Sequence, residues 1–175
     1  EWDWIIGVNL RGVIHGIEIF LPLIRSHGDE GHIVNTASIA GFQVRPGRRS
    51  GAYAATKYAV VALSESLAQD LADTPIGVSV LAPAAVNTQI YRSGENRPAR
   101  FGGPFAPSAD DPLHEQIKSG LDPDEVGARV VRAIHAREFF IFTHIETRAW
   151  LEARHQRIID AYADCERWEA GRKSK

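Results

Sequence analysis

Apolar residues recur every three or four positions in four stretches of the chain, which cover residues 4–24, 52–70, 122–136 and 148–169. This spacing predicts four helices, each with one apolar face. In the first stretch, Gly16 and Pro22 predict an interruption or a bend. The third stretch starts with Asp122 in the N-cap position and Pro123 in the first helical position, a pairing typical of helix starts.

Three short apolar runs alternate with these helical stretches and are rich in β-branched or aromatic residues. They read HIVNTAS at residues 32–38, GVSVLAP at 77–83 and FFIFTH at 139–144. Such runs predict buried strands, the first ending near Ala37 and the second at Pro83. Strands that alternate with helices predict an α/β fold with a parallel sheet. Because sheets usually hold more than three strands, half of the sheet is expected to be missing from this chain.

The chain of 175 residues, 44% of them hydrophobic and 24% charged, is long enough for one domain with its own core. Its net charge of −2, with both signs mixed along the sequence, argues against nucleic acid or an anionic membrane as the main partner. No uninterrupted apolar run approaches the roughly 20 residues that span a bilayer. The single cysteine, Cys165, cannot form a disulfide within the chain, so a cytoplasmic location is expected.

The first residues, EWDWIIGVNL, contain neither an initiating methionine nor the features of a signal peptide. We expect from this that the chain begins in the middle of a longer protein.

Candidate chemistry starts with Tyr53 and Lys57, which lie four residues apart in the helical stretch 52–70 and so share one helix face. A phenol ordinarily titrates near ~10, and an adjacent ammonium is expected to lower that pKa by favouring the phenolate. The pair is therefore a candidate acid/base. The alternative is a well-packed helix, rich in alanine, in which both residues are incidental.

Ser38 and Asn9 are the other polar residues of interest. Ser38 lies just past the end of the first predicted strand, and ligands bind at the carboxyl ends of strands in open parallel sheets. A serine there also caps or turns a chain, and that interpretation stays open. Asn9 lies inside the first helical stretch, where an asparagine is usually a solvent-facing or packing residue.

Two stretches have the composition of loops. Residues 41–51 contain Pro46, Gly47 and three arginines, which predicts an exposed loop. Residues 91–112 combine four prolines with three glycines and scattered charges, which predicts an irregular or mobile lid, with a linker between domains as the alternative.

Asn9, Ser38, Tyr53 and Lys57, in this order and in these predicted elements, resemble the catalytic tetrad of the short-chain dehydrogenase/reductase family. The sequence around them, VNLRG, HIVNTAS, YAATKYAV and VSVLAPAAVNT, resembles that family as well, and the resemblance spans residues 5–88. The family implies a Rossmann-like, doubly wound parallel sheet, which this chain would contain only as its C-terminal half. Residues 1–175 would then form a single partial domain, with a substrate-loop region at 91–112 and a C-terminal helix at 147–170.

The resemblance implies a role for each residue of the tetrad. Tyr53 would be the general acid in carbonyl reduction and the general base in alcohol oxidation. Lys57 would lower the pKa of Tyr53 and hold the hydroxyls of the nicotinamide ribose. Ser38 would hydrogen-bond the substrate oxygen, and Asn9 would support a water-mediated proton path to Lys57.

The resemblance also implies NAD or NADP as the cofactor and a secondary alcohol or ketone as the small-molecule substrate. Thr88 and the backbone near Val86 would meet the nicotinamide carboxamide, and Pro83 would shape the loop beneath that ring. The family commonly forms homodimers or homotetramers, and no metal ligand set is predicted in the chain.

Three features depart from the family's pattern. The glycine-rich loop that holds the dinucleotide pyrophosphate is absent from the sequence. The usual Pro-Gly after the later strand is Pro83-Ala84, which removes backbone freedom at that point. The loop from Ser38 to Tyr53 is slightly longer than is common, through RPGRR. The simplest interpretation is the C-terminal portion of a longer enzyme, with an exposed sheet edge.

A non-catalytic interaction module, which would use the helices at residues 4–24 and 52–70 as a dimer surface, is the alternative to an oxidoreductase. The sequence leaves the substrate open, because Tyr91, Phe101 and Phe105 in the 91–112 stretch are mixed with arginines. It also leaves the choice between NAD and NADP open, because the residue that usually reads the ribose 2′ position would lie in the missing half.

Overall fold

The computed structural model describes residues 1–44, 50–106 and 112–173. Residues 1–143 form one compact unit, and residues 144–175 form a second. The described elements, in chain order, are α1 (Trp2–Ile6), η1 (Gly7–Arg11), α2 (Gly12–His27), β1 (Gly31–Thr36), η2 (Ile39–Gly41), α3 (Gly51–Asp70), β2 (Ile76–Ala82), η3 (Gln89–Asn96), η4 (Ala99–Phe101), α4 (Pro112–Lys118), α5 (Pro123–Ala136), β3 (Phe140–Phe142), η5 (Ile145–Thr147) and α6 (Arg148–Lys173).

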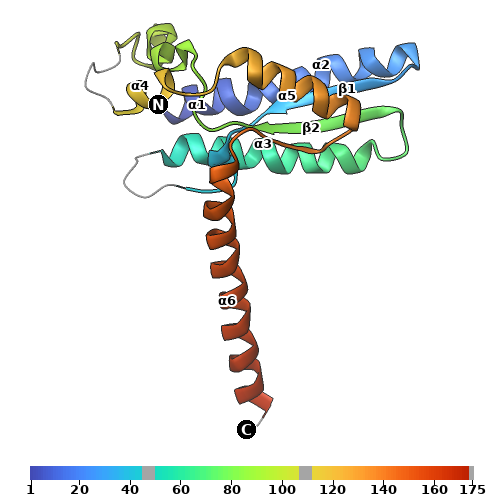
Figure 1. Cartoon of the computed structure of the whole chain (residues 1–175), viewed down its shortest axis with the longest axis vertical. Coiled ribbons are helices and arrows are strands. Elements are labelled where there is room, and N and C mark those ends of the chain that lie inside the picture. The colour runs from blue at the N-terminus through green and yellow to red at the C-terminus, as the bar shows by residue number, and fades with distance from the viewer. Residues whose placement is uncertain (45–49, 107–111, 174–175) are drawn as a thin grey trace. The chain divides into compact units, whose positions relative to one another are not determined.

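The three strands pair side by side in the order β1-β2-β3, and both pairings are parallel. The α/β fold with an incomplete parallel sheet, predicted from the sequence, is therefore confirmed. In Figure 1 the strands lie between α5 on one side and α3 on the other. Side chains alternate between these faces along each strand, as the strand period of two requires. Val78 and Val80 thus pack in the α3-side core clusters, and Leu81 packs with Ala133 of α5.

The irregular part of the N-terminal helix lies earlier in the sequence than predicted. Gly16 and Pro22 both lie inside the regular helix α2, and the irregular turn is the π-helical segment Gly7–Arg11. A π turn inserts one residue into the hydrogen-bond ladder and occurs often at functional positions. Asn9 lies within this turn, and sequence spacing gives no signal for it.

The same helix corrects the expectation about apolar length. Residues Trp2–His27 are helical throughout, with a window of mean hydropathy 1.4 and none of that window buried, so this helix is long and apolar enough to cross a membrane by length and composition alone. The prediction looked for an uninterrupted apolar run. In this helix polar residues are spread among the apolar ones, so no run is long although the mean hydropathy of the window is high. One such helix is weak evidence for a membrane span, because mostly buried core helices and N-terminal signal sequences pass the same test.

The third predicted helix is confirmed at its start. Asp122 accepts a hydrogen bond from the backbone N–H of Asp124 at 2.8 Å, and Pro123 is the first residue of α5. Sequence spacing predicted no helix at Pro112–Lys118, where α4 lies. The 91–112 stretch was predicted to be irregular. The short 3-10 helices η3 and η4 cover most of residues 89–101, and Pro107 lies outside the described residues.

The stretch 41–51, expected to be an exposed loop, begins inside the fold. Gly41 ends η2 and is buried, because the turn packs directly on α3. Pro46, Gly47 and the RPGRR insertion lie outside the described residues.

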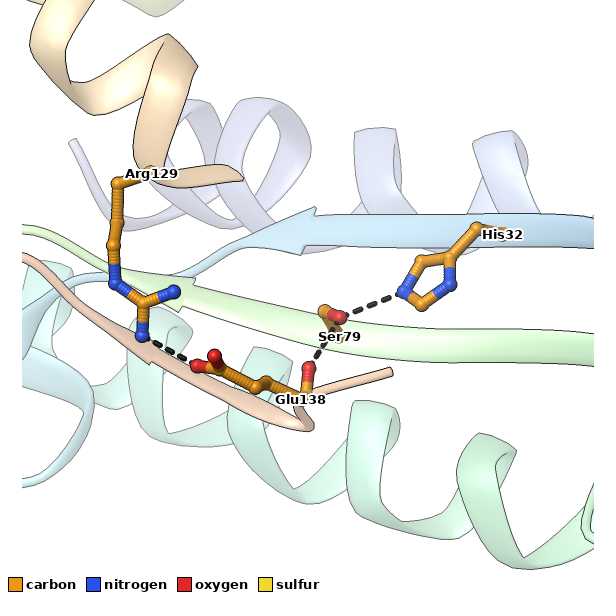
Figure 2. Close-up of polar contacts among 4 residues, drawn as sticks. All are labelled: His32, Ser79, Arg129 and Glu138. Atoms are coloured by element: carbon orange, nitrogen blue, oxygen red, sulfur yellow. Dashed lines mark hydrogen bonds and ion pairs between the residues drawn. The ribbon is translucent and has the colours of Figure 1, made fainter. Parts of the chain in front are cut away.

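A polar chain crosses the α5 face of the sheet, as Figure 2 shows. His32 Nε2 lies 2.7 Å from Ser79 Oγ, and Ser79 donates to the carbonyl of Glu138 at 2.6 Å. The carboxylate of Glu138 pairs with Arg129 of α5 at 2.5 Å. Residue 77, opposite His32 on β2, is a glycine, and a Cβ there would collide with the imidazole. These hydrogen bonds and this ion pair thus join β1, β2 and the segment just before β3.

This polar chain predicts that unit 1–143 loses stability in mild acid. Burial, and then the nearby Arg137, lower the pKa of His32 below its ordinary 6.5. The unfolded chain therefore takes up the proton first, so the contribution of neutral His32 is complete above pH ~6.5 and is lost as pH falls toward its folded-state pKa. Urea midpoints measured near pH 7.5 and near pH 5.5 should differ more in the wild type than in His32→Gln. Equal losses in the two proteins would contradict this account.

Candidate active site

Ser38 lies directly beyond the end of β1, where the backbone leaves the sheet. It is the N-cap of η2, and its hydroxyl accepts from the backbone N–H of Ala40 at 3.1 Å. The next residue, Ile39, donates its N–H to the carbonyl of Pro83 at 3.0 Å, and the Ser38 hydroxyl lies 3.4 Å from the same carbonyl. The predicted position of Ser38 just after a strand is confirmed. The interpretation that Ser38 caps the chain is confirmed too, because the same residue is the N-cap of η2. The ends of β1 and β2 are thereby joined at Ser38.

Tyr53 and Lys57 lie in the first two turns of α3 and on one face, as their spacing predicts. Tyr53 forms a side-chain hydrogen bond with Ser38. The Lys57 ammonium donates to the carbonyl of Thr36 at 2.9 Å and lies 5.7 Å from the centre of the Tyr53 ring. The structure thus brings Ser38, Tyr53 and Lys57 together at the carboxyl end of β1.

The pKa of Tyr53 differs from the expectation in its direction. Burial raises this pKa above 10.0, and the hydrogen bond with Ser38 lowers it by a smaller amount. Lys57 was expected to lower it, but its ammonium lies by the ring and bonds a backbone carbonyl, and burial lowers the pKa of Lys57 itself. Desolvation disfavours both the phenolate and the ammonium. Tyr53 is therefore a neutral phenol at neutral pH, able to donate a proton.

Asn9 is linked to Tyr53 through Thr56, a residue that the sequence analysis did not identify. Its amide donates to Thr56 Oγ1 at 3.3 Å, and that hydroxyl donates to the backbone carbonyl of Tyr53 at 2.7 Å. Thr56 is only 2% exposed. The N-terminal helix and the Tyr53 turn of α3 are thus tied together by a buried hydroxyl, next to Lys57 in the sequence.

Gly41 sets how closely the Ser38 turn approaches α3. A Cβ at residue 41 would lie 2.6 Å from the carbonyl oxygen of Lys57 and 3.0 Å from a methyl of Val61. Only a residue without a side chain allows this contact between two backbones. The nearest atoms belong to Lys57 and Val61 rather than to an alanine, so the alanine-rich pattern of the helix gave no signal for Gly41.

Residues expected to meet a nicotinamide lie after β2. Val86 forms a parallel β-bridge with Leu121, and Asn87 donates to the Leu121 carbonyl at 2.9 Å. Gly120 makes this possible, because a Cβ there would lie 2.5 Å from the carbonyl of Ala85. Thr88 caps η3 by accepting from the N–H of Ile90 at 3.4 Å. The roles of Pro83, Val86 and Thr88 toward a cofactor stay predictions.

The Pro83-Ala84 pair introduces no strain of the kind that glycine relieves. Among the described residues, Arg137 is the only non-glycine residue with a positive φ. Ala84 therefore adopts a conformation open to any residue, and the family's usual glycine is not needed for this backbone path.

The 89–105 segment is fastened to the N-terminal helix by aromatic contacts. The guanidinium of Arg97 lies 5.8 Å from the ring of Trp4 and 5.8 Å from the ring of Phe105. The carbonyl of Gly94 accepts from the N–H groups of both Arg97 and Phe105. Phe105 therefore contacts Arg97 while its side chain stays 51% exposed, and a contact between Phe105 and a substrate stays a prediction.

Among the described residues, no group of three His, Cys, Asp or Glu side chains gathers closely enough to hold a metal ion. The site therefore consists of hydroxyl, phenol, amide and ammonium groups at the carboxyl ends of two parallel strands. This set can bind an oxygen atom, donate a proton to it and hold hydroxyl groups beside it.

The comparisons with known proteins agree with this site. The sequence model of the short chain dehydrogenase family matches residues 1–98, more than half of the chain, and the chain belongs to that family. A C alpha-dehydrogenase of Sphingobium sp. is 35% identical over 169 residues, covering 95% of this chain and 55% of the relative. A CLA biosynthesis dehydrogenase/reductase of Lactiplantibacillus plantarum is 30% identical over 169 residues, covering 91% of this chain and 58% of the relative.

Among solved structures, a short chain dehydrogenase/reductase from Burkholderia phymatum, crystallised in complex with NAD, has a TM-score of 0.83 and 37% sequence identity. The match covers 90% of this chain and 58% of that protein. The chain thus spans little more than half the length of these relatives.

The Gly41 contact yields a prediction for stability. Gly41→Ala should destabilise unit 1–143 by about 1–3 kcal/mol, the usual cost of overpacking, because neither backbone can yield without moving α3 or the Ser38 turn. Gly51→Ala is the matched control, because a Cβ at this exposed first residue of α3 meets nothing within 4 Å. Urea unfolding measures both. A Gly41→Ala protein as stable as the control would show that the turn and helix are not in tight contact.

Proposed function

We propose that the protein containing this chain is an NAD(P)-dependent oxidoreductase that interconverts a secondary alcohol and a ketone. The observation that supports this most directly is the hydrogen bond between Ser38 and Tyr53 beside the Lys57 ammonium. Two hydroxyl groups and one cation lie together there at the strand ends, where parallel α/β sheets bind their ligands. The family to which the chain belongs supports the same reaction.

The residues present fit the nicotinamide end of such a cofactor. An ammonium has three N–H donors, and Lys57 is seen to use one of them on the Thr36 carbonyl, which leaves donors for ribose hydroxyls. Pro83, Val86 and Thr88 follow the neighbouring strand at the same sheet edge. The relative from Burkholderia phymatum was solved with NAD. The cofactor supplies or accepts the hydride at its nicotinamide ring.

Tyr53 and Ser38 act on the substrate oxygen. In ketone reduction, the neutral phenol of Tyr53 donates its proton to that oxygen as negative charge develops there. Ser38 turns its single hydroxyl proton from the Pro83 carbonyl to the same substrate oxygen, while the N–H of Ala40 still holds its Oγ. In alcohol oxidation the direction reverses, and Tyr53 must first be a phenolate.

Lys57 and Asn9 support this proton transfer. The Lys57 ammonium stabilises negative charge on Tyr53 during transfer, although burial opposes that charge in the resting site. Asn9 positions the first turn of α3 through Thr56, and this contact supports its expected part in a proton path toward Lys57. A cytoplasmic enzyme with a small, apolar substrate is the simplest form of the proposal.

A second candidate function, self-association into a homodimer or homotetramer, is supported by the exposed apolar residues of the N-terminal helix. Val8, Ile19, Phe20 and Leu23 are each between 57% and 60% exposed. Water-exposed apolar side chains gathered on one element favour an interface. The two candidates are compatible, since the proton-transfer residues lie at the strand ends.

Replacement of the Tyr53 hydroxyl tests the acid/base role. In the intact protein, Tyr53→Phe should lower kcat by about 10²–10⁴-fold, the usual contribution of general acid–base catalysis, while the protein keeps its oligomeric state. Tyr58→Phe, five residues further along α3, is the matched control and should keep wild-type kcat. Because the pKa of Tyr53 is raised, wild-type alcohol oxidation should accelerate as pH rises into the alkaline range.

Wild-type hydride transfer by Tyr53→Phe would refute the proposed role of Tyr53. Loss of the oligomer together with activity would instead point to a structural role of this helix.

A further inference from the structure

Among the described residues of its own unit, α6 follows the short turn η5 and contacts no other helix or strand. None of its residues from Arg148 to Lys173 is buried. The side-chain pairs Arg148 with Glu152, Gln156 with Asp160 and Arg167 with Asp164 lie along the helix itself. Such exposed pairs stabilise a helix only slightly, and most helical stability in proteins comes from tertiary packing of an apolar face. A helix of 26 residues therefore needs a surface to cover it.

One face of α6 carries a seam of five apolar or weakly polar residues and one arginine. Leu151, Ile158 and Cys165 recur every seven residues, and Arg154, Ala161 and Trp168 follow each of them by three. This is the spacing of the a and d positions in a two-helix pair. A shallow groove runs along the same face, lined by Arg154, Arg157, Ile158, Ala161, Tyr162 and Cys165. Within the seam, Trp168 is 60% exposed and Ile158 is 39% exposed.

Charge is divided between the two halves of α6. Residues 148–159 contain three arginines and one glutamate, a net charge of +2, whereas residues 160–171 contain four acidic residues and one arginine, a net charge of −3. The helix dipole favours the opposite order, with acidic residues near the N-terminus. An isolated helix gains nothing from this arrangement. Two copies placed head to tail, however, bring the positive half of each against the negative half of the other.

We propose that α6 pairs in an antiparallel arrangement with α6 of a second copy of this chain. The register that covers the seam most fully places Leu151 against Trp168 of the second copy, Ile158 against Ala161, and Arg154 against Cys165. Arg157 then lies close to Asp164 of the second copy. The aliphatic stem of Arg154 covers the seam while its guanidinium reaches the rim. Parallel pairing would instead set the acidic halves side by side.

The register makes a covalent test possible because the chain has a single cysteine. In the antiparallel pair, the two native Cys165 residues lie about 11 positions apart, roughly 16 Å along the axis, too far for a disulfide. A thiol introduced by Arg154→Cys lies opposite Cys165 of the second copy. The full chain is oxidised with diamide at low protein concentration, and products are separated on a non-reducing gel.

We expect the Arg154→Cys chain to shift to a disulfide-linked dimer, with mass spectrometry placing the bond between the introduced thiol and Cys165. Wild type and the matched control Ala153→Cys, whose thiol points away from the seam, should stay as non-covalent species. Efficient dimerisation of the wild type through Cys165 would overturn the antiparallel arrangement in favour of a parallel one.

Failure of the Arg154→Cys chain to cross-link, in a protein whose circular dichroism shows α6 intact, would overturn pairing with a second copy. None of these outcomes depends on hydride transfer, so the test is independent of the proposed function.

Discussion

The backbone contact between Gly41 and α3 is the constraint on which the site depends. It holds the Ser38 turn against the start of the helix that carries Tyr53 and Lys57. The other side of the turn is fixed by the Ile39 bond to Pro83, so Ser38 is held between β2 and α3. Precise distances between catalytic groups require such rigid support, because small displacements of reacting groups reduce rates strongly. The site is thus a property of packing between the sheet and one helix.

Burial has two opposed effects on this site. The packing that positions Tyr53 and Lys57 also removes water from them, which raises the pKa of the phenol and lowers that of the ammonium. The resting site therefore favours the neutral phenol, the form that the proposed reduction of a ketone requires. The same desolvation strengthens each hydrogen bond to charge that develops during reaction. On the opposite face of the sheet, the polar contacts of His32, Ser79 and Glu138 join the strands. They lie away from Tyr53 and Lys57 and stabilise the fold.

The sequence could predict the parts of this structure that follow from local patterns. Periodicity predicted α3, α5, α6 and the three strands, and the Asp122 cap followed from one residue preference. The π turn around Asn9, the buried Gly41 and the Thr56 link could not be predicted, because each depends on which segments meet after folding. The pKa of Tyr53 was predicted with the wrong sign, since sequence spacing shows the neighbouring cation but not the loss of water. Proximity in sequence was enough to find the residues, but their electrostatics required the fold.

The central claim is the proposal that Ser38, Tyr53 and Lys57 are the proton-transfer residues of a short chain dehydrogenase site, in a chain whose sequence has no glycine-rich loop for a dinucleotide pyrophosphate. Calorimetric titration of the folded 175-residue chain with NADH, and then with NADPH, tests this central claim most directly. We predict no saturable binding up to roughly 1 mM, the upper end of common KM values. Saturable binding of one cofactor molecule per chain would contradict the claim, because residues of this chain would then have to replace the glycine-rich loop.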